Sequence, residues 1–98
     1  MTKSKTRPVK RHPDLLPMHP GELLREVVLP ALDVPVPALA ETLGIPAHTL
    51  REILAEKKPV TPEIAVRLAA AFKPSAEVWL RLQTTYDLWH AKRRVDTS

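Results

Sequence analysis

The 98-residue chain contains no cysteine, two glycines and few aromatic residues. The lack of cysteine excludes a disulfide framework, a thiolate metal site and a thiol nucleophile, which is typical of intracellular proteins. Two isolated glycines exclude a glycine-rich loop for phosphate binding. No apolar run approaches the ~20 residues of a membrane helix, and the basic N-terminus is not followed by the apolar core of a signal peptide. We expect one small cytoplasmic domain without membrane contact and without a metal or other cofactor.

Charge is present in modest excess of one sign, with 15 Lys and Arg against 11 Asp and Glu and a net charge of +4. Its distribution along the chain is uneven. Five basic side chains against Asp14 fall within residues 1–19, and three against Asp96 fall within residues 92–98. The residues between are therefore net acidic. The positive charge that suggests a polyanionic partner is carried by the two ends of the chain.

From His19 onward, apolar residues recur at helical spacing, while no stretch alternates long enough to predict a strand. Prolines mark the expected helix starts, because the first helical position needs no backbone N–H. The sequence predicts helices that begin near Pro20, Pro37, Pro46, Pro62 and Ser75. Pro30 is expected to kink or end the first of them. The predicted fold class is all-α, with five helices.

Residues 36–55 have the spacing of a helix-turn-helix motif. Such a motif needs a small residue where the second helix crosses the first, and a glycine with positive φ in the turn. Ala40 and Gly44 fill these two positions. The apolar residues that would clamp the two helices are Leu39, Leu43, Ile45, Leu50 and Ile53. An ordinary αα-hairpin shows the same apolar pattern, but alanine and glycine at this spacing favour the DNA-binding motif.

Three stretches of the sequence resemble the HigA-type antitoxins of bacterial toxin–antitoxin pairs, which belong to the Cro/phage-repressor (XRE) class of helix-turn-helix proteins. They are HPGE at residues 19–22, the motif at residues 39–50, and residues 61–89, which contain TPEIA and WLRLQ. The resemblance implies a five-helix, repressor-like fold. It also implies an antitoxin that neutralises a small RelE/HigB-like ribonuclease by direct binding and represses its own operon by binding operator DNA as a dimer.

In a helix-turn-helix protein, the N-terminal part of the second helix lies in the major groove. Its side chains can contact thymine methyl groups, guanine acceptors or cytosine amino groups. The candidates for base edges are Ala47, His48, Arg51 and Glu52. Glu52 could equally pair with Arg51 or Lys58 as ordinary surface charge. The candidates for phosphate, a non-specific and salt-dependent contact that Arg51 could also make, are Arg7, Lys10, Arg11, Thr49, Lys57 and Lys58.

These patterns divide the chain into a flexible basic arm at residues 1–18, a helix-turn-helix domain at residues 19–91 and a basic tail at residues 92–98. The last helix of the domain carries apolar side chains at spacings of three, four and three, as in a helix–helix seam. They are Trp79, Leu82, Tyr86 and Trp89. The same residues could pack inside the domain. A dimer is also expected because recognition helices bind in pairs about one DNA turn apart.

Three other functions compete with the antitoxin interpretation. The first is an enzyme, but the sequence lacks the residues of an active site, since the four histidines are scattered and none forms a metal-binding pair such as H-E-x-x-H. A helix-turn-helix transcription regulator without a toxin partner fits the residues equally well. A protein-interaction module with weakened DNA binding is a third alternative, because Ala47 and Glu52 stand where a recognition helix usually presents stronger donors to DNA.

Overall fold

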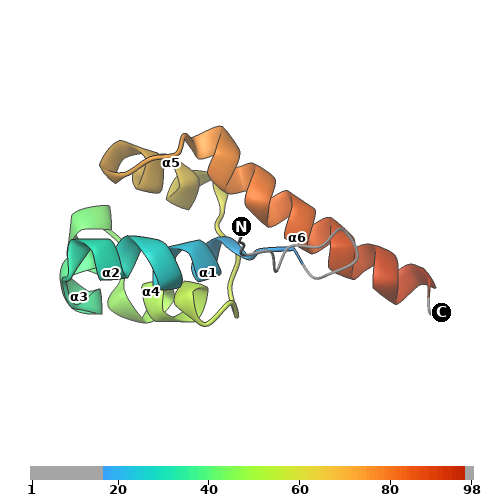
Figure 1. Cartoon of the computed structure of the whole chain (residues 1–98), viewed down its shortest axis with the longest axis horizontal. Helices are drawn as coiled ribbons and strands as arrows, with labels where there is room; N and C mark the ends of the chain where they lie inside the picture. Colours follow the sequence, from blue (N-terminus) through green and yellow to red (C-terminus); the bar gives the residue numbers. More distant parts are fainter. Residues whose placement is uncertain (1–16, 97–98) are drawn as a thin grey trace, which may run out of the picture.

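The computed structural model describes residues 17–96 and is built from helices alone over that range (Figure 1). The first helical run spans residues 20–32 in three parts: α1 (Pro20–Leu23), the π-helical turn η1 (Leu24–Val28) and α2 (Leu29–Leu32). It is followed by α3 (Val36–Leu43), α4 (Ala47–Leu54), α5 (Pro62–Ala71) and α6 (Ala76–Asp96). The predicted all-α fold with five helices is confirmed in the described part of the chain.

The first helical run continues through Pro30, and the turn before the proline is π-helical. The backbone N–H of Leu29 bonds to the carbonyl of Leu24, five residues back, so the turn before the proline is wider than an α-helical turn. Proline lacks an N–H and its ring clashes with the preceding turn of a regular helix, which the wider turn relieves. The run ends at Leu32, where Asp33 adopts a left-handed conformation with φ of 56°.

Most helix starts coincide with the predicted proline and hydroxyl positions. Thr61 caps α5, its side chain accepting a hydrogen bond of 3.3 Å from the backbone N–H of Ile64, and Pro62 takes the first helical position. Ser75 accepts from the N–H of Val78 in the same way before α6. Pro46 precedes α4 as its cap residue, whereas α3 begins one residue before Pro37.

The hydrophobic core joins all five helices around the side chain of Trp79, which is completely buried. Its other large members are Leu24, Leu39, Leu50, Ile53, Val60 and Leu68. Four of the five predicted clamp residues of the motif are buried in this core, and the fifth, Ile45, packs partly buried against it. The core therefore fixes α3 and α4 relative to each other and to α1 and α6.

Helix α6 is much longer than the others and projects beyond the body of the molecule (Figure 1). The sequence placed residues 92–98 in a basic tail, but α6 continues through Asp96, so Lys92, Arg93 and Arg94 lie on the helix. Helical hydrogen bonding thus extends about one turn further than predicted. Within the described residues, no helix is both long and apolar enough to cross a bilayer. Residues 1–16, including Arg7, Lys10 and Arg11 of the predicted arm, lie outside the described part.

Candidate nucleic-acid interface

The turn between α3 and α4 has the geometry that a helix-turn-helix requires. Gly44 has φ of 73°, and its N–H bonds to the carbonyl of Glu41 at 3.1 Å while the N–H of Ile45 bonds to that of Ala40 at 3.1 Å. The guanidinium of Arg67, reaching over from α5, donates to the carbonyl of Leu43 at 3.1 Å. These bonds satisfy carbonyls at the end of α3 and direct the chain into α4.

On the outer face of α4, two of the four predicted base-edge residues are exposed, and the side chain of a third, Glu52, is 43% exposed. His48 and Arg51 are exposed to solvent. Ala47 is partly buried and packs against the core, and Thr49 is partly buried as well. His48 and Arg51 are therefore the exposed members of the predicted set, and both belong to the first one and a half turns of α4.

Glu52 forms an ion pair with Lys58 on the surface, its Oε1 lying 3.1 Å from Nζ of Lys58. Both side chains are about half exposed, so the pair contributes at most about 1 kcal/mol to stability. This is one of the two pairings that the sequence left open for Glu52. It places a cation directly beside the carboxylate that would otherwise repel phosphate.

The segment after α4 makes a tight turn that presents Lys57 and Lys58. Glu56 has φ of 63°, an uncommon left-handed conformation for a residue other than glycine. The backbone N–H of Lys57 then bonds back to the carbonyl of Glu52 at 2.8 Å. Both lysine side chains are exposed. The two predicted phosphate contacts of this segment thus sit on a turn held against the end of α4.

His19 caps the first helix from a buried position. Its Nδ1 accepts a hydrogen bond of 2.8 Å from the backbone N–H of Gly21, and its ring packs edge-on against Tyr86 of α6. Burial lowers the pKa of His19 below its ordinary value of 6.5, although the carboxylates of Glu56 and Asp87 partly offset this. The neutral ring is required here, because only an unprotonated Nδ1 can accept the bond.

Gly21 allows the first helix to lie directly on α4. A Cβ at this position would overlap the backbone carbonyl oxygen of Ile53. The HPGE sequence is thereby explained residue by residue: His19 caps, Pro20 occupies the first helical position, and Gly21 permits the close approach. The sequence pattern marked this stretch through the family resemblance but gave no sign of its contact with α4.

Gln83 of α6 holds the chain that connects α4 to α5. Its Oε1 accepts from the backbone N–H of Val60 at 2.7 Å, and its Nε2 donates to Asp87 at 2.9 Å. Gln83 and Val60 are both buried. The glutamine of the WLRLQ stretch therefore satisfies a backbone donor that water cannot reach, a role that periodicity alone could not reveal.

The four aromatic and apolar residues predicted for a dimer interface divide between the interior and the surface. Trp79 is completely buried within its own chain, so it is removed from the set that a second copy could contact. Leu82, Tyr86 and Trp89 remain partly exposed, with the guanidinium of Arg93 lying 4.7 Å from the centre of the Trp89 ring. The sequence spacing could not separate these two environments because both occur on one helix.

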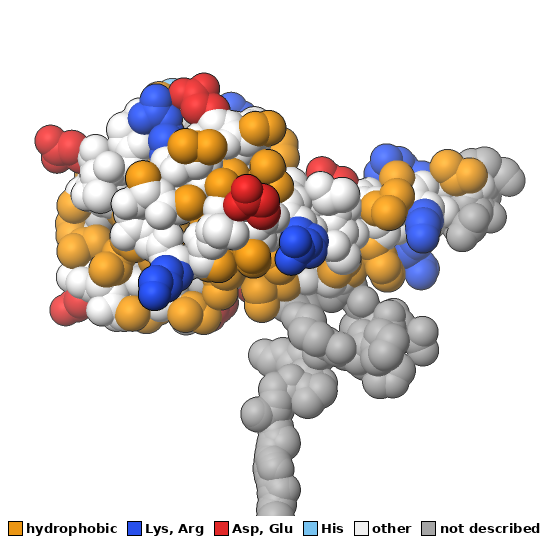
Figure 2. All heavy atoms as spheres, turned by 90° about the horizontal axis from the view of Figure 1, so that it is seen from above, with side chains coloured by type: hydrophobic (Ala, Val, Ile, Leu, Met, Phe, Trp, Pro, Cys, Tyr) orange, Lys and Arg blue, Asp and Glu red, His pale blue; other side chains and the backbone are white. Residues whose placement is uncertain are grey.

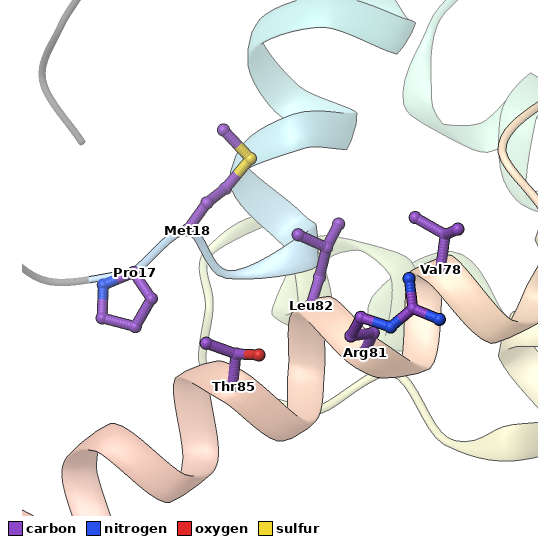
Figure 3. Close-up of a pocket in the computed structure, with 6 residues that line it drawn as sticks. All are labelled: Pro17, Met18, Val78, Arg81, Leu82 and Thr85. Carbon is purple, nitrogen blue, oxygen red and sulfur yellow. The ribbon is translucent and has the colours of Figure 1, made fainter. Parts of the chain in front are cut away.

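Leu82 belongs to an apolar groove of about 170 Å³ between α6 and the segment that leads into α1 (Figure 3). Its other lining residues are Pro17, Met18, Val78, Arg81 and Thr85. Further along α6, Leu88 and Val95 are exposed over half or more of their surface. Figure 2 shows hydrophobic side chains interspersed with Lys and Arg on this projecting end.

Comparison with known proteins identifies the family to which the chain belongs. No protein-family model matches the chain. Antitoxin HigA-1 of Vibrio cholerae is 32% identical over 94 residues, which span 96% of this chain and 80% of that protein. The chain belongs to the HigA family of helix-turn-helix antitoxins.

Two solved structures of HigA proteins share the fold. An addiction module antidote protein of the HigA family from Coxiella burnetii is 34% identical with a TM-score of 0.78, covering 85% of this chain and 90% of that one. The antitoxin HigA of Pseudomonas aeruginosa, solved with the higBA promoter, is 36% identical with a TM-score of 0.78, covering 83% and 88%. The predicted resemblance to HigA antitoxins is confirmed, and so is the prediction that the chain is no enzyme, since its relatives are antitoxins and transcription regulators.

Proposed function

We propose that this HigA-family protein binds operator DNA as a dimer and neutralises a small RelE/HigB-like ribonuclease by direct binding. The observation that carries the proposal is the α3–α4 unit, with its left-handed Gly44 turn and the exposed pair His48 and Arg51 at the start of α4. This is the part of a helix-turn-helix that lies in the major groove. The Pseudomonas aeruginosa relative with the same fold was solved with promoter DNA.

DNA contacts are assigned to two groups on this surface. His48 and Arg51 read base edges, where an imidazole or guanidinium donates to guanine acceptors. Lys57 and Lys58 contact phosphates on the turn after α4. The carboxylate of Glu52, paired with Lys58, no longer argues against DNA binding, which weakens the alternative of a pure protein-interaction module. Ala47 lies at the margin of the core and is left with a methyl contact at most.

Fluorescence anisotropy on the promoter fragment upstream of the protein's own gene tests the assignment. Arg51→Ala is expected to weaken specific binding by about tenfold or more, because a base-edge contact contributes roughly 1–3 kcal/mol of discrimination. Lys73→Ala, which removes one exposed charge in the α5–α6 connection, is the matched control. An equal decrease in affinity in both variants would show that net charge rather than α4 determines binding.

The basic arm supplies further phosphate contacts in this proposal, since residues 19–91 carry nine Asp and Glu against seven Lys and Arg. Arg7, Lys10 and Arg11 would follow the backbone of the DNA into the minor groove. Deleting residues 2–11 is expected to reduce the slope of log K against log salt by about one for each phosphate that the arm neutralises. An unchanged slope would remove the arm from the interface.

The dimer is assigned to the face of α6 that the core does not cover. Leu82 at the apolar groove, together with Tyr86 and Trp89, gives this face the apolar area that a second copy can bury. Sedimentation at micromolar concentration should show a dimer, and Trp89→Ala should shift it toward monomer with little change in the folding of the domain. A monomeric wild type would contradict the proposal.

The ribonuclease partner is proposed on family membership, and its test is separate from that of DNA. Co-expression with the small basic product of the neighbouring reading frame should yield a stable complex and relieve growth arrest. A protein that binds its promoter but captures no such partner would be a transcription regulator without a toxin, which is the second function that the sequence allows.

A further inference from the structure

Arg25, in the π-helical turn of the first helix, reaches across to the end of α4. Its Nη1 donates to the carbonyl of Leu54 at 2.6 Å, and its Nη2 lies 3.1 Å from the carboxylate of Glu56. A second carboxylate, Glu26, lies 3.0 Å from its Nε. One guanidinium therefore binds both the last residue of α4 and the residue that turns the chain out of it.

The turn that Arg25 holds is the one that places the two lysines. Glu56 stands in the left-handed conformation, which costs a residue with a side chain roughly 1–2 kcal/mol and so needs support from its surroundings. Directly after it, the backbone N–H groups of Lys57 and Lys58 both point to the carbonyl of Glu52, at 2.8 and 3.3 Å. Freeing the Glu56 side chain would leave the left-handed residue of this turn without its side-chain anchor and would loosen the backbone that directs the two lysines.

We propose that Arg25 and Glu56 form a positioning clamp that fixes Lys57 and Lys58 for contact with the phosphate backbone of DNA. The inference deepens the proposed function and rests on it. Neither clamp residue needs to touch DNA, and Glu56 carries the charge that DNA repels. Its contribution is to hold the turn, so that the backbone that carries the lysines loses less conformational freedom on binding.

A stabilising role alone does not account for this arrangement. The Arg25 side chain is 40% exposed and that of Glu56 25%, and ion pairs of this kind contribute little to the free energy of unfolding. The end of α4 is already fixed by Gly21 against Ile53 and by core packing of Leu54. What the clamp adds is a side-chain anchor at Glu56 for the turn of residues 56–58, beyond the backbone hydrogen bonds of Lys57 and Lys58 to Glu52 and the ion pair between Lys58 and Glu52.

The sign of the effect of Glu56→Ala on DNA affinity tests the clamp. By charge alone, removing a carboxylate near DNA should tighten binding. If the clamp positions the lysines, Glu56→Ala instead weakens binding to the promoter fragment by about threefold to tenfold and lowers the slope of log K against log salt by roughly one. Glu77→Ala is the control, because it also removes one carboxylate, exposed in the first turn of α6, and should leave binding equal or slightly tighter.

Two further variants distinguish the clamp from a direct phosphate contact by Arg25 and from a loss of folding. Arg25→Lys keeps the charge but loses the fork that spans Leu54 and Glu56, so it should bind as weakly as Glu56→Ala, whereas a direct phosphate contact by Arg25 would be rescued by lysine. If thermal unfolding shows that Glu56→Ala is not folded, Glu56→Gln replaces it with the same expected direction.

The outcomes separate the clamp from the proposed function. Glu56→Ala binding as tightly as wild type or tighter, while Lys57→Ala weakens binding, overturns the clamp and leaves the DNA-binding proposal standing. An unaffected Lys57→Ala in a protein that binds DNA also overturns the clamp, because the lysine then has no phosphate to contact. A wild-type protein that does not bind its promoter overturns both.

Discussion

The two ends of α4 are fixed in different ways. At its beginning, the Gly44 turn is supported by the guanidinium of Arg67, which is itself about 40% exposed. At its end, α4 meets the backbone of Gly21, and the segment that follows is bonded to α6 through the buried N–H of Val60 and the side chain of Gln83. The contacts therefore anchor α4 at its C-terminal end and leave its N-terminal end accessible.

This asymmetry suits a helix that presents its N-terminal part to a ligand. Side chains at the open end, such as His48 and Arg51, can adjust to a surface without disturbing the core. The anchored end keeps the helix axis in place, because its carbonyls and the next turn are bound by other helices. Substitutions at the two ends of α4 test this contrast, because their effects on the free energy of unfolding should differ strongly.

The largest difference is expected between the two glycines of the chain. Gly21→Ala should lower the free energy of unfolding by about 3 kcal/mol or prevent folding, since the new Cβ overlaps a backbone carbonyl that cannot move without shifting α4. Gly44→Ala should cost about 1–2 kcal/mol, the strain of a left-handed residue, because the nearest atom to its Cβ is the flexible end of Arg67, 2.6 Å away. Urea unfolding followed by circular dichroism measures both.

A result in which Gly44→Ala costs as much as Gly21→Ala would contradict the asymmetry. It would mean that the turn between α3 and α4 is as rigidly enclosed as the contact between α1 and α4. Ala31→Gly serves as a control for the general effect of exchanging glycine and alanine in the first helical run, because Ala31 is exposed there. Its effect should stay near 1 kcal/mol.

Much of the open end of α4 could be predicted from the sequence, because local chemistry determines it. A positive φ at Gly44, a helix start after Pro46 and the buried face of Leu50 and Ile53 all follow from residue type and spacing. Thr61 likewise follows the rules for helix caps. For these positions, the local preference of the chain and the final fold agree.

The anchored end could not be predicted in the same way. Contacts of Arg25 with Leu54 and of Gln83 with Val60 join residues 29 and 23 positions apart, which no periodicity records. Pro30 predicted that the first helix would be kinked or would end, but not that a π-helical turn carrying Arg25 would form before it. Trp79 and Trp89 share one helix and similar spacing, so their different burial depends on where the body of the protein ends.

The next largest effect is expected for Gln83→Leu, at the anchored end. The buried N–H of Val60 would lose its acceptor and remain unpaired, at a cost of about 2 kcal/mol, even though leucine is more apolar. Thr84→Leu, on the exposed side of the same helix, is the control and should be nearly neutral. If both variants unfold at the same urea concentration, Gln83 does not secure the segment after α4.

The smallest effect depends on pH and comes from His19. Because burial lowers the pKa of His19 in the folded protein, the unfolded chain binds more protons below pH 6.5, so the free energy of unfolding falls as pH decreases from there through the lower folded pKa. His19→Asn retains an acceptor for the N–H of Gly21 but does not titrate. Urea unfolding of both proteins between pH 8 and 5 should show a steeper loss for wild type, because protonation of Nδ1 removes the cap. Parallel curves would mean that the cap at the anchored end tolerates a charged ring, and that Gly21, Arg25 and core packing hold the first helix on α4 without it.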